Sequence, residues 1–153
     1  KEKELELEQS LVLCYTNSDH GDVDIHKSQK ANTSIKNIET NIDKNVILTY
    51  DIRNYLLKGD LNQIGHTLNK SWKLKKTYSK YISNSKLDKL YKNALINGAL
   101  GGKLLGAGGG GFFLFYVIPN EKNNFIKWIN NEGMIYYNVN FENQGMISWT
   151  VRI

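Results

Sequence analysis

The residues best suited to binding a ligand form a glycine-dense segment in the last third of the chain. Five of the six residues from 106 to 111 are glycine, and the sixth is Ala107. Without Cβ atoms, the chain can adopt positive φ at several positions and can let another backbone or a phosphate approach closely. N–H groups in such a turn can surround an anion. Ordering glycines costs roughly 1 kcal/mol or more per residue in backbone entropy, so the segment favours a ligand or domain contact over an idle hairpin tip.

Two common phosphate-binding motifs are excluded by what surrounds these glycines. Gly106, Gly108 and Gly111 have the G-x-G-x-x-G spacing of dinucleotide-binding loops. That motif requires a helix after the loop, because the pyrophosphate sits at the helix N-terminus. Here the loop runs into the aromatic residues 112–117, which are typical of a strand. A Walker loop is excluded because no Gly-Lys-Ser or Gly-Lys-Thr sequence is present.

The elements before the loop are predicted from hydrophobic spacing. Residues 11–16 form a short apolar run that predicts a buried strand, followed by the polar cluster 17–22. A long helical region follows, and Gly59 and Asp60 predict a helix stop and the N-cap of the next helix. The Ser85–Asp88 stretch matches a capping box and predicts a further helix that ends near Gly98. The apolar stripes of these helices are Ile35, Ile38, Ile42, Ile52, Tyr55 and Leu56, then Leu61, Ile64, Leu68 and Trp72, then Leu87, Leu90, Tyr91 and Ala94.

After the loop the pattern predicts strand, helix, strand, strand. Pro119 closes the strand that follows the glycines, and a short amphipathic helix ends at Gly133. Residues 135–141 and 147–153 both alternate apolar and polar, which predicts two final strands. The whole order predicts one α+β domain over residues 1–153. A split β-α-β antiparallel sheet, with helices on one face and extra helices after the first strand, accommodates this order.

Composition argues against nucleic-acid and metal binding. The net charge is +5, but the lysines are spread along the chain among acidic residues, and the arginines are Arg53 and Arg152. A nucleic-acid binder usually concentrates its basic residues on one face. His26 and His66 have no Cys or His partner at metal-ligand spacing, so we expect no metal site.

The same composition predicts a cytoplasmic protein that does not enter the membrane. The single cysteine, Cys14, cannot form an intramolecular disulfide and reads as a small hydrophobe in a strand. The charged start of the chain has no apolar signal region. Residues 95–118 contain one charge, Lys103, but eight glycines, which predict two strands and a turn instead of a membrane helix.

The segment from Gly101 to Phe112 resembles the third motif of the GHMP kinase superfamily, which includes galactose, homoserine, mevalonate and phosphomevalonate kinases. It resembles the version in the heptose 7-phosphate kinase branch. The resemblance extends over nearly the whole chain. The flanking residues that agree are Tyr15, Thr16, Ile25, Gln29, His66, Trp72, Leu74, Lys75, Lys76, Ser79, Ser83, Asn84, Leu87, Asp88, Tyr91, Gly98 and Ala99.

This resemblance implies a ferredoxin-like C-terminal domain whose loop, Gly106, Ala107, Gly108, Gly109, Gly110 and Gly111, lines an active-site cleft. There it would support the phosphate loop of an N-terminal ATP-binding domain, which is the implied partner and is absent from this chain. The implied reaction transfers the γ-phosphoryl group of ATP, with Mg²⁺, to a hydroxyl of a sugar or sugar phosphate. No catalytic residue and no metal ligand is expected in this chain. The chain alone is expected to be inactive, and a homodimer is compatible with this assignment.

Four residues are candidate substrate contacts. Lys75 and Lys76 could meet a phosphate, although lysines at a helix end are more often a solvated surface, and Lys103 lies inside the motif. The fourth candidate is His20. Asn17 and His20 stand where the family commonly has Gly and Arg, and a histidine contacts phosphate less well than an arginine at neutral pH. The alternative function is a stand-alone ferredoxin-like ligand-binding or regulatory module that uses the glycine turn as an anion site.

Overall fold

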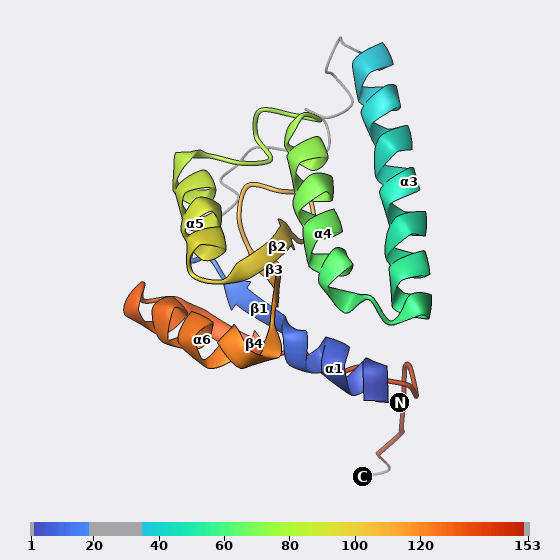
Figure 1. Cartoon of the computed structure of the whole chain (residues 1–153), viewed down its shortest axis with the longest axis vertical. Coiled ribbons are helices and arrows are strands. Elements are labelled where there is room, and N and C mark those ends of the chain that lie inside the picture. Colours follow the sequence, from blue (N-terminus) through green and yellow to red (C-terminus); the bar gives the residue numbers. More distant parts are fainter. Residues whose placement is uncertain (1, 19–34, 152–153) are drawn as a thin grey trace.

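The computed structural model describes residues 2–18 and 35–151. These residues form helices packed around an antiparallel sheet (Figure 1). The elements in chain order are α1 (Glu2–Ser10), β1 (Leu11–Tyr15), α3 (Ile35–Lys58), α4 (Leu61–Lys76), α5 (Ser85–Ile96), β2 (Ala99–Leu104), β3 (Phe112–Val117), the 3₁₀ turn η1 (Pro119–Glu121), α6 (Lys122–Asn131) and β4 (Ile135–Asn138).

The sheet has the strand order β2-β3-β1-β4, and the neighbouring strands in it are antiparallel. It follows that β1 is parallel to β2 with β3 between them, and that β3 is parallel to β4 with β1 between them. Each pair is connected through helices, which is the split β-α-β arrangement. The α+β fold class and the extra helices after the first strand are therefore confirmed.

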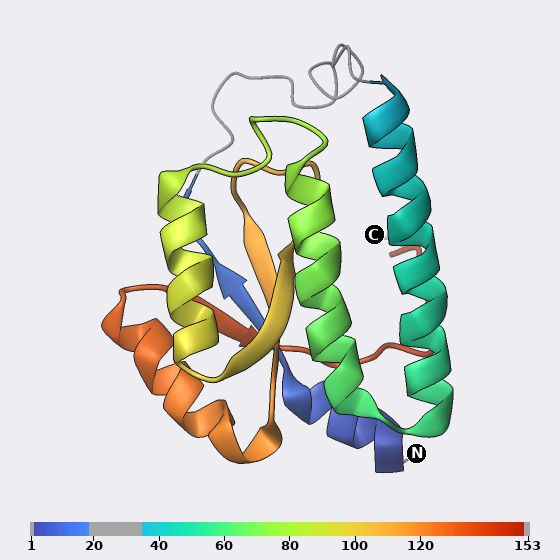
Figure 2. The ribbon, with the colours of Figure 1, turned by 45° about the horizontal axis from the view of Figure 1, so that its top comes forward.

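The sheet has apolar side chains on both faces, because successive residues of a strand point to opposite sides. Helices α5 and α6 cover the face that carries Val12, Phe113 and Phe115. The opposite face carries Leu11 and Tyr116, which pack with residues of α4. Figure 2 shows α4 beside the sheet and α3 outside α4. The expectation that helices pack on one face was therefore wrong for the first part of α4, whereas Trp72 near its end packs with Phe113 on the same face as α5 and α6.

Two glycines allow α4 to approach the sheet closely. A Cβ at Gly101 in β2 would overlap the carbonyl oxygen of Gly65 in α4, and a Cβ at Gly65 would lie 2.8 Å from Tyr116. Both glycines are buried. Helix–strand packing therefore requires glycine at both positions. The glycines from 106 to 111 are not part of this contact and remain candidates for binding a ligand or another domain.

Two local predictions need correction, and one helix was not predicted. Residues 147–151 form no strand, and Ile147, Trp149 and Val151 are exposed, because the described chain offers no neighbouring strand to pair with them. The N-cap of α5 is Asn84 and not Ser85: its side chain accepts a hydrogen bond from Leu87 N. Helix α1 was not anticipated, because its sequence lacks a strong apolar stripe.

Other predictions agree with the structure. Asp60 is the N-cap residue of α4, although its side chain makes no capping hydrogen bond. Trp72 and Cys14 are fully buried in the core. Residues 99–117 form two strands and a turn, and no helix among the described residues is long and apolar enough to span a membrane.

Candidate functional site

The glycine loop connects β2 to β3 through a turn that only glycine adopts readily. Gly106, Gly108, Gly109 and Gly111 all have positive φ, between +71° and +123°. L-residues with side chains are strained in this region. A hydrogen bond from Leu105 N to Phe112 O, at 2.8 Å, closes the base of the turn. The loop is therefore an ordered structure with a backbone conformation that its sequence makes possible.

One side of this loop packs against the chain's own main chain. Gly109 N donates to Ile82 O at 2.9 Å, and a Cβ at Gly108 would lie 2.8 Å from the Cα of Ile82. Gly111 N donates to Ser18 O at 3.2 Å. The close main-chain approach that the glycines predicted occurs here, within the chain itself. The N–H groups of Gly109 and Gly111 are engaged in these hydrogen bonds and are therefore not available to bind an anion.

The exposed part of the loop is its first half. Leu105 and Gly106 are exposed, whereas residues 108–110 are buried. Lys75, at the end of α4, donates from Nζ to Leu104 O at 2.9 Å and to Gly106 O at 2.5 Å. The side chain thus ties α4 to the exposed end of the loop and brings a positive charge there.

Lys103 adds a second positive charge near Lys75. Burial and the neighbouring Lys103 lower the pKa of Lys75 to about 8, and burial also lowers the pKa of Lys103. Among the described residues, no carboxylate forms an ion pair with either lysine. Two partly desolvated ammonium groups that lack a counter-ion within residues 2–18 and 35–151 favour an anion between or beside them. We call Lys75, Lys103 and loop residues 104–106 the lysine–glycine site.

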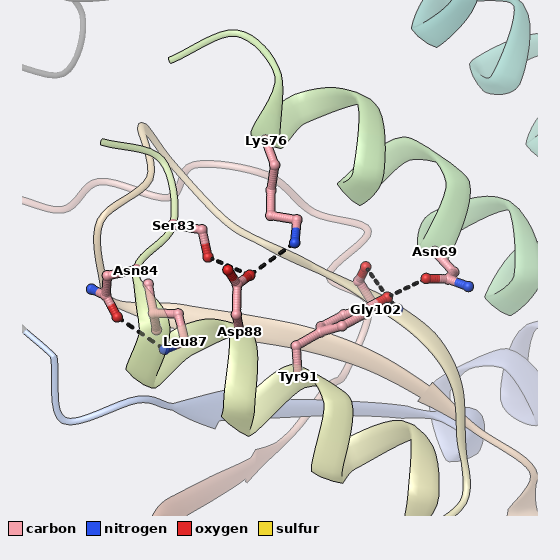
Figure 3. A network of polar contacts seen from close by, with 8 residues as sticks. All are labelled: Asn69, Lys76, Ser83, Asn84, Leu87, Asp88, Tyr91 and Gly102. Carbon is pink, nitrogen blue, oxygen red and sulfur yellow. Dashed lines mark hydrogen bonds and ion pairs between the residues drawn. The ribbon is translucent and has the colours of Figure 1, made fainter. Parts of the chain in front are cut away.

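Lys76 does not belong to this site. Its Nζ lies 2.8 Å from Asp88 Oδ1, which also accepts a hydrogen bond from Ser83 at 2.9 Å (Figure 3). The ammonium group also lies 5.9 Å from the centre of the Trp72 ring. These contacts link the end of α4 to the first turn of α5, which is a structural role.

A buried hydroxyl holds the strand that leads into the loop. Tyr91 of α5 donates to Asn69 Oδ1 at 3.0 Å and lies 3.2 Å from both the N and the O of Gly102 (Figure 3). Burial raises the pKa of Tyr91. Because this hydroxyl contacts α4 and β2 at once, it fixes the direction in which β2 enters the glycine loop.

A cavity of about 290 Å³ lies near the other end of the loop. The hydroxyl of Thr16 is buried and has no hydrogen-bond partner among the described residues, while Thr16 N donates to Gly111 O at 2.9 Å. The cavity offers donors and acceptors for a small polar molecule. It is lined by Thr16, Asn17, Lys86, Lys89, Leu90, Asn93, Glu132 and Met134.

Sequence reasoning found the loop and Lys75 but missed their neighbours. Ile82, Ser18 and the cavity residues come from segments far apart in the chain, and no motif or spacing links them. His20 lies outside the described residues. Within residues 2–18 and 35–151, no group of three His, Cys, Asp or Glu could hold a metal ion.

The fold and the loop agree with known proteins. Residues 52–127 match the family model described as GHMP kinases C terminal, a region that includes the glycine loop. The chain is 35% identical over 150 residues to D-glycero-alpha-D-manno-heptose 7-phosphate kinase of Campylobacter jejuni, covering 95% of this chain and 43% of the relative. The chain therefore spans less than half of that protein.

Solved structures show the same relationship. A crystal structure from Campylobacter jejuni, provisionally named a sugar kinase, has a TM-score of 0.64 and 32% identity, over 97% of this chain and 41% of that one. The mevalonate kinase of Methanococcus jannaschii has a TM-score of 0.71 at 24% identity, over 94% of this chain and 43% of that one, and shares the fold. The family match, the shared topology and the loop together show that this chain carries a GHMP kinase C-terminal domain.

Proposed function

We propose that this chain is the C-terminal part of an ATP-dependent kinase that phosphorylates a sugar or sugar phosphate, with a heptose phosphate as the first substrate to test. The observation that carries the proposal is the 35% identity with a heptose 7-phosphate kinase over 95% of the chain. The lysine–glycine site supports it, because this site offers positive charge at an exposed, side-chain-poor loop.

In this proposal, the described residues hold and orient a phosphorylated ligand. Lys75 fixes the exposed end of the loop through two carbonyl oxygens and adds charge. Lys103 donates no hydrogen bond to another described residue, so its ammonium group is the better candidate for direct contact with a phosphate oxygen. Gly106 leaves space for close approach, since a Cβ there would meet no atom within 4 Å. Such positioning and charge neutralisation account for most of the catalysis of phosphoryl transfer.

The remaining requirements fall on a part of the protein outside this chain. ATP, when bound with Mg²⁺, supplies the phosphoryl group. Mg²⁺ prefers carboxylate, phosphate and water oxygens, and the described residues contain no acidic cluster for it. We therefore infer that an N-terminal domain provides the phosphate loop and the metal ligands, and that the exposed end of the glycine loop, at Gly106, packs against it. A reaction that consumes ATP also suits the cytoplasm, where we place the protein.

The proposal is tested by measuring ADP release in the protein that includes the upstream half. We expect turnover with ATP, Mg²⁺ and a heptose phosphate, and none from the 153-residue chain alone. Lys103→Met should lower kcat/KM by about tenfold or more. Lys76→Met is the matched control, because Lys76 is already paired with Asp88, and should leave kcat/KM within about threefold.

Two results would contradict the proposal. One is full turnover by the isolated chain, which would mean that no upstream domain is needed. The other is the absence of turnover with every sugar and sugar phosphate tested, combined with tight calorimetric binding of an amino acid by the isolated chain. That second result would assign the chain to the class of ligand-binding regulatory modules.

A further inference from the structure

The outer surface of α3 carries an apolar stripe that no described element covers. The inner surface of this helix faces α4: Asn41 Nδ2 donates to Thr77 Oγ1 at 2.9 Å, and Asn45 Oδ1 accepts from Ser71 at 2.7 Å. Ile52 and Tyr55 also pack inward. Figures 1 and 2 both show α3 at the edge of the molecule, with α4 on one side of it.

The side chains of this stripe are large and exposed. Ile42, Val46, Tyr50 and Leu57 are 46, 48, 61 and 71% exposed. At 100° per residue, these four positions fall within about 80° of one another around the helix axis. They are therefore one continuous stripe, which is a common sign of a protein–protein contact. Glu39 and Arg53, both exposed, fall in the same 80° sector. We call these six residues the α3 stripe.

Five of the six residues of the α3 stripe, all except Leu57, are arranged symmetrically about Val46. Ile42 and Tyr50 lie four residues before and after Val46, and Glu39 and Arg53 lie seven residues before and after it. When two copies of a helix pair antiparallel about a two-fold axis, residues equidistant from the centre lie opposite each other. With the axis at Val46, Ile42 would meet Tyr50 of the other copy, and Glu39 would meet Arg53.

The antiparallel register gives the charged residues of the α3 stripe partners of opposite charge, and a parallel pairing does not. In the antiparallel pair Val46 faces Val46 and Ile42 faces Tyr50, so apolar residues meet at the centre, and two Glu–Arg pairs of opposite charge form on either side of them. In a parallel pair Glu39 would face Glu39 and Arg53 would face Arg53, which is repulsive. The stripe is thus self-complementary in the placement of its central apolar residues and of its charges.

From this symmetry we propose that α3 is a homodimer interface, in which two copies of the chain pair antiparallel through the α3 stripe with Val46 at the two-fold axis. The occupant of the stripe is then a second copy. The interface places the two lysine–glycine sites in one dimer but requires no contact between them, so the proposal is independent of the proposed kinase function.

Charge reversal tests the pairing. Sedimentation equilibrium of the 153-residue chain, from micromolar to millimolar concentration, should show a monomer–dimer equilibrium. Arg53→Glu and Glu39→Arg should each weaken dimerisation by about tenfold or more, because each creates two like-charge pairs. The double variant should restore the affinity to within about threefold of the wild type. Lys127→Glu, an exposed change of equal charge on α6, is the control and should have little effect.

A cross-linking measurement tests the position of the axis. Val46→Cys should form an intermolecular disulfide on oxidation, because residue 46 faces itself across the axis. Leu57→Cys should not, because the two copies of residue 57 would lie about 33 Å apart at 1.5 Å per residue. Cys14 is buried and does not compete. Circular dichroism checks that each variant keeps its helices.

Three outcomes would overturn the proposal. The first is a monomer at every concentration. The second is a dimer whose affinity the double variant fails to restore, or in which Leu57→Cys cross-links as well as Val46→Cys. The third is a Val46→Cys cross-link that forms in this chain but not in the protein with its upstream half, which would mean that the upstream half covers the stripe.

Discussion

The carbonyl oxygen of Gly65 in α4 faces the Cα of Gly101 in β2 so closely that no side chain fits between them. This contact lets α4 lie directly on the strand that leads into the glycine loop. It also places Lys75, ten residues further along α4, within hydrogen-bonding distance of Leu104 and Gly106. Helix packing and the candidate site are therefore linked through one close approach.

We predict that Gly101→Ala destabilises the protein by about 3 kcal/mol, as expected for overpacking against backbone that cannot move aside. The measurement is the midpoint and slope of urea unfolding. Gly106→Ala is the control: its φ is +71°, but a Cβ there has open space around it. It should cost about 1 kcal/mol from the left-handed backbone alone. Equal effects of the two substitutions would contradict the packing role of Gly101.

The N-cap of α5 gives a second prediction. Asn84→Ala should lower the free energy of unfolding by about 1 kcal/mol, because the hydrogen bond from Leu87 N to Asn84 Oδ1 is lost. Ser85→Ala should change it by less than about 0.5 kcal/mol, since Ser85 lies inside the first turn. A larger loss for Ser85→Ala would show that the capping box read from the sequence was right after all.

Lys75 should titrate near neutrality and respond to anions. Burial and the neighbouring Lys103 lower its pKa to about 8 in the folded chain, from an ordinary value of 10.5. The folded state therefore binds this proton less tightly than the unfolded state. The free-energy cost of keeping the charged ammonium group partly buried is complete below a pH of about 8, and it decreases as the pH rises from there toward 10.5. The difference in stability between wild type and Lys75→Met should accordingly shift in favour of the wild type over that range.

The same titration can be observed directly by NMR of the lysine Cε and Hε signals. Adding inorganic phosphate should raise the Lys75 midpoint, because an adjacent anion favours the charged ammonium form. Lys92, which is exposed on α5, serves as the internal control. A Lys75 midpoint that phosphate leaves unchanged would argue against an anion at the lysine–glycine site.

Cys14 should be almost unreactive in the folded chain. Burial raises its pKa to about 12 from 9.0, so little thiolate is present at mildly alkaline pH. Its folded pKa is the higher one, so its stabilising contribution is complete below 9.0 and is lost as pH rises through about 12. Alkylation by iodoacetamide, followed by mass spectrometry, should be slow in buffer and fast in denaturant. Rapid labelling in buffer would mean that β1 opens readily.

Much of the fold could be predicted because its signals are local. Apolar spacing, Gly59 and Asp60 marked the boundary between α3 and α4, and the run 112–117 identified β3. The final strand was wrong because alternation shows only that a strand could form. Residues 147–151 alternate correctly but find no partner strand among the described residues, and a strand without a partner is not stable.

The sequence by itself determined the backbone freedom of residues 106–111, since glycine is the residue that tolerates several positive φ values in one turn. It also determined the order of helices and strands around that turn. Only the tertiary structure decided what the turn contacts. Lys75 and Lys76 are neighbours in sequence, yet successive residues of a helix point about 100° apart. One therefore reaches the glycine loop and the other reaches Asp88, and long-range packing decides which partner stands on each side of the helix.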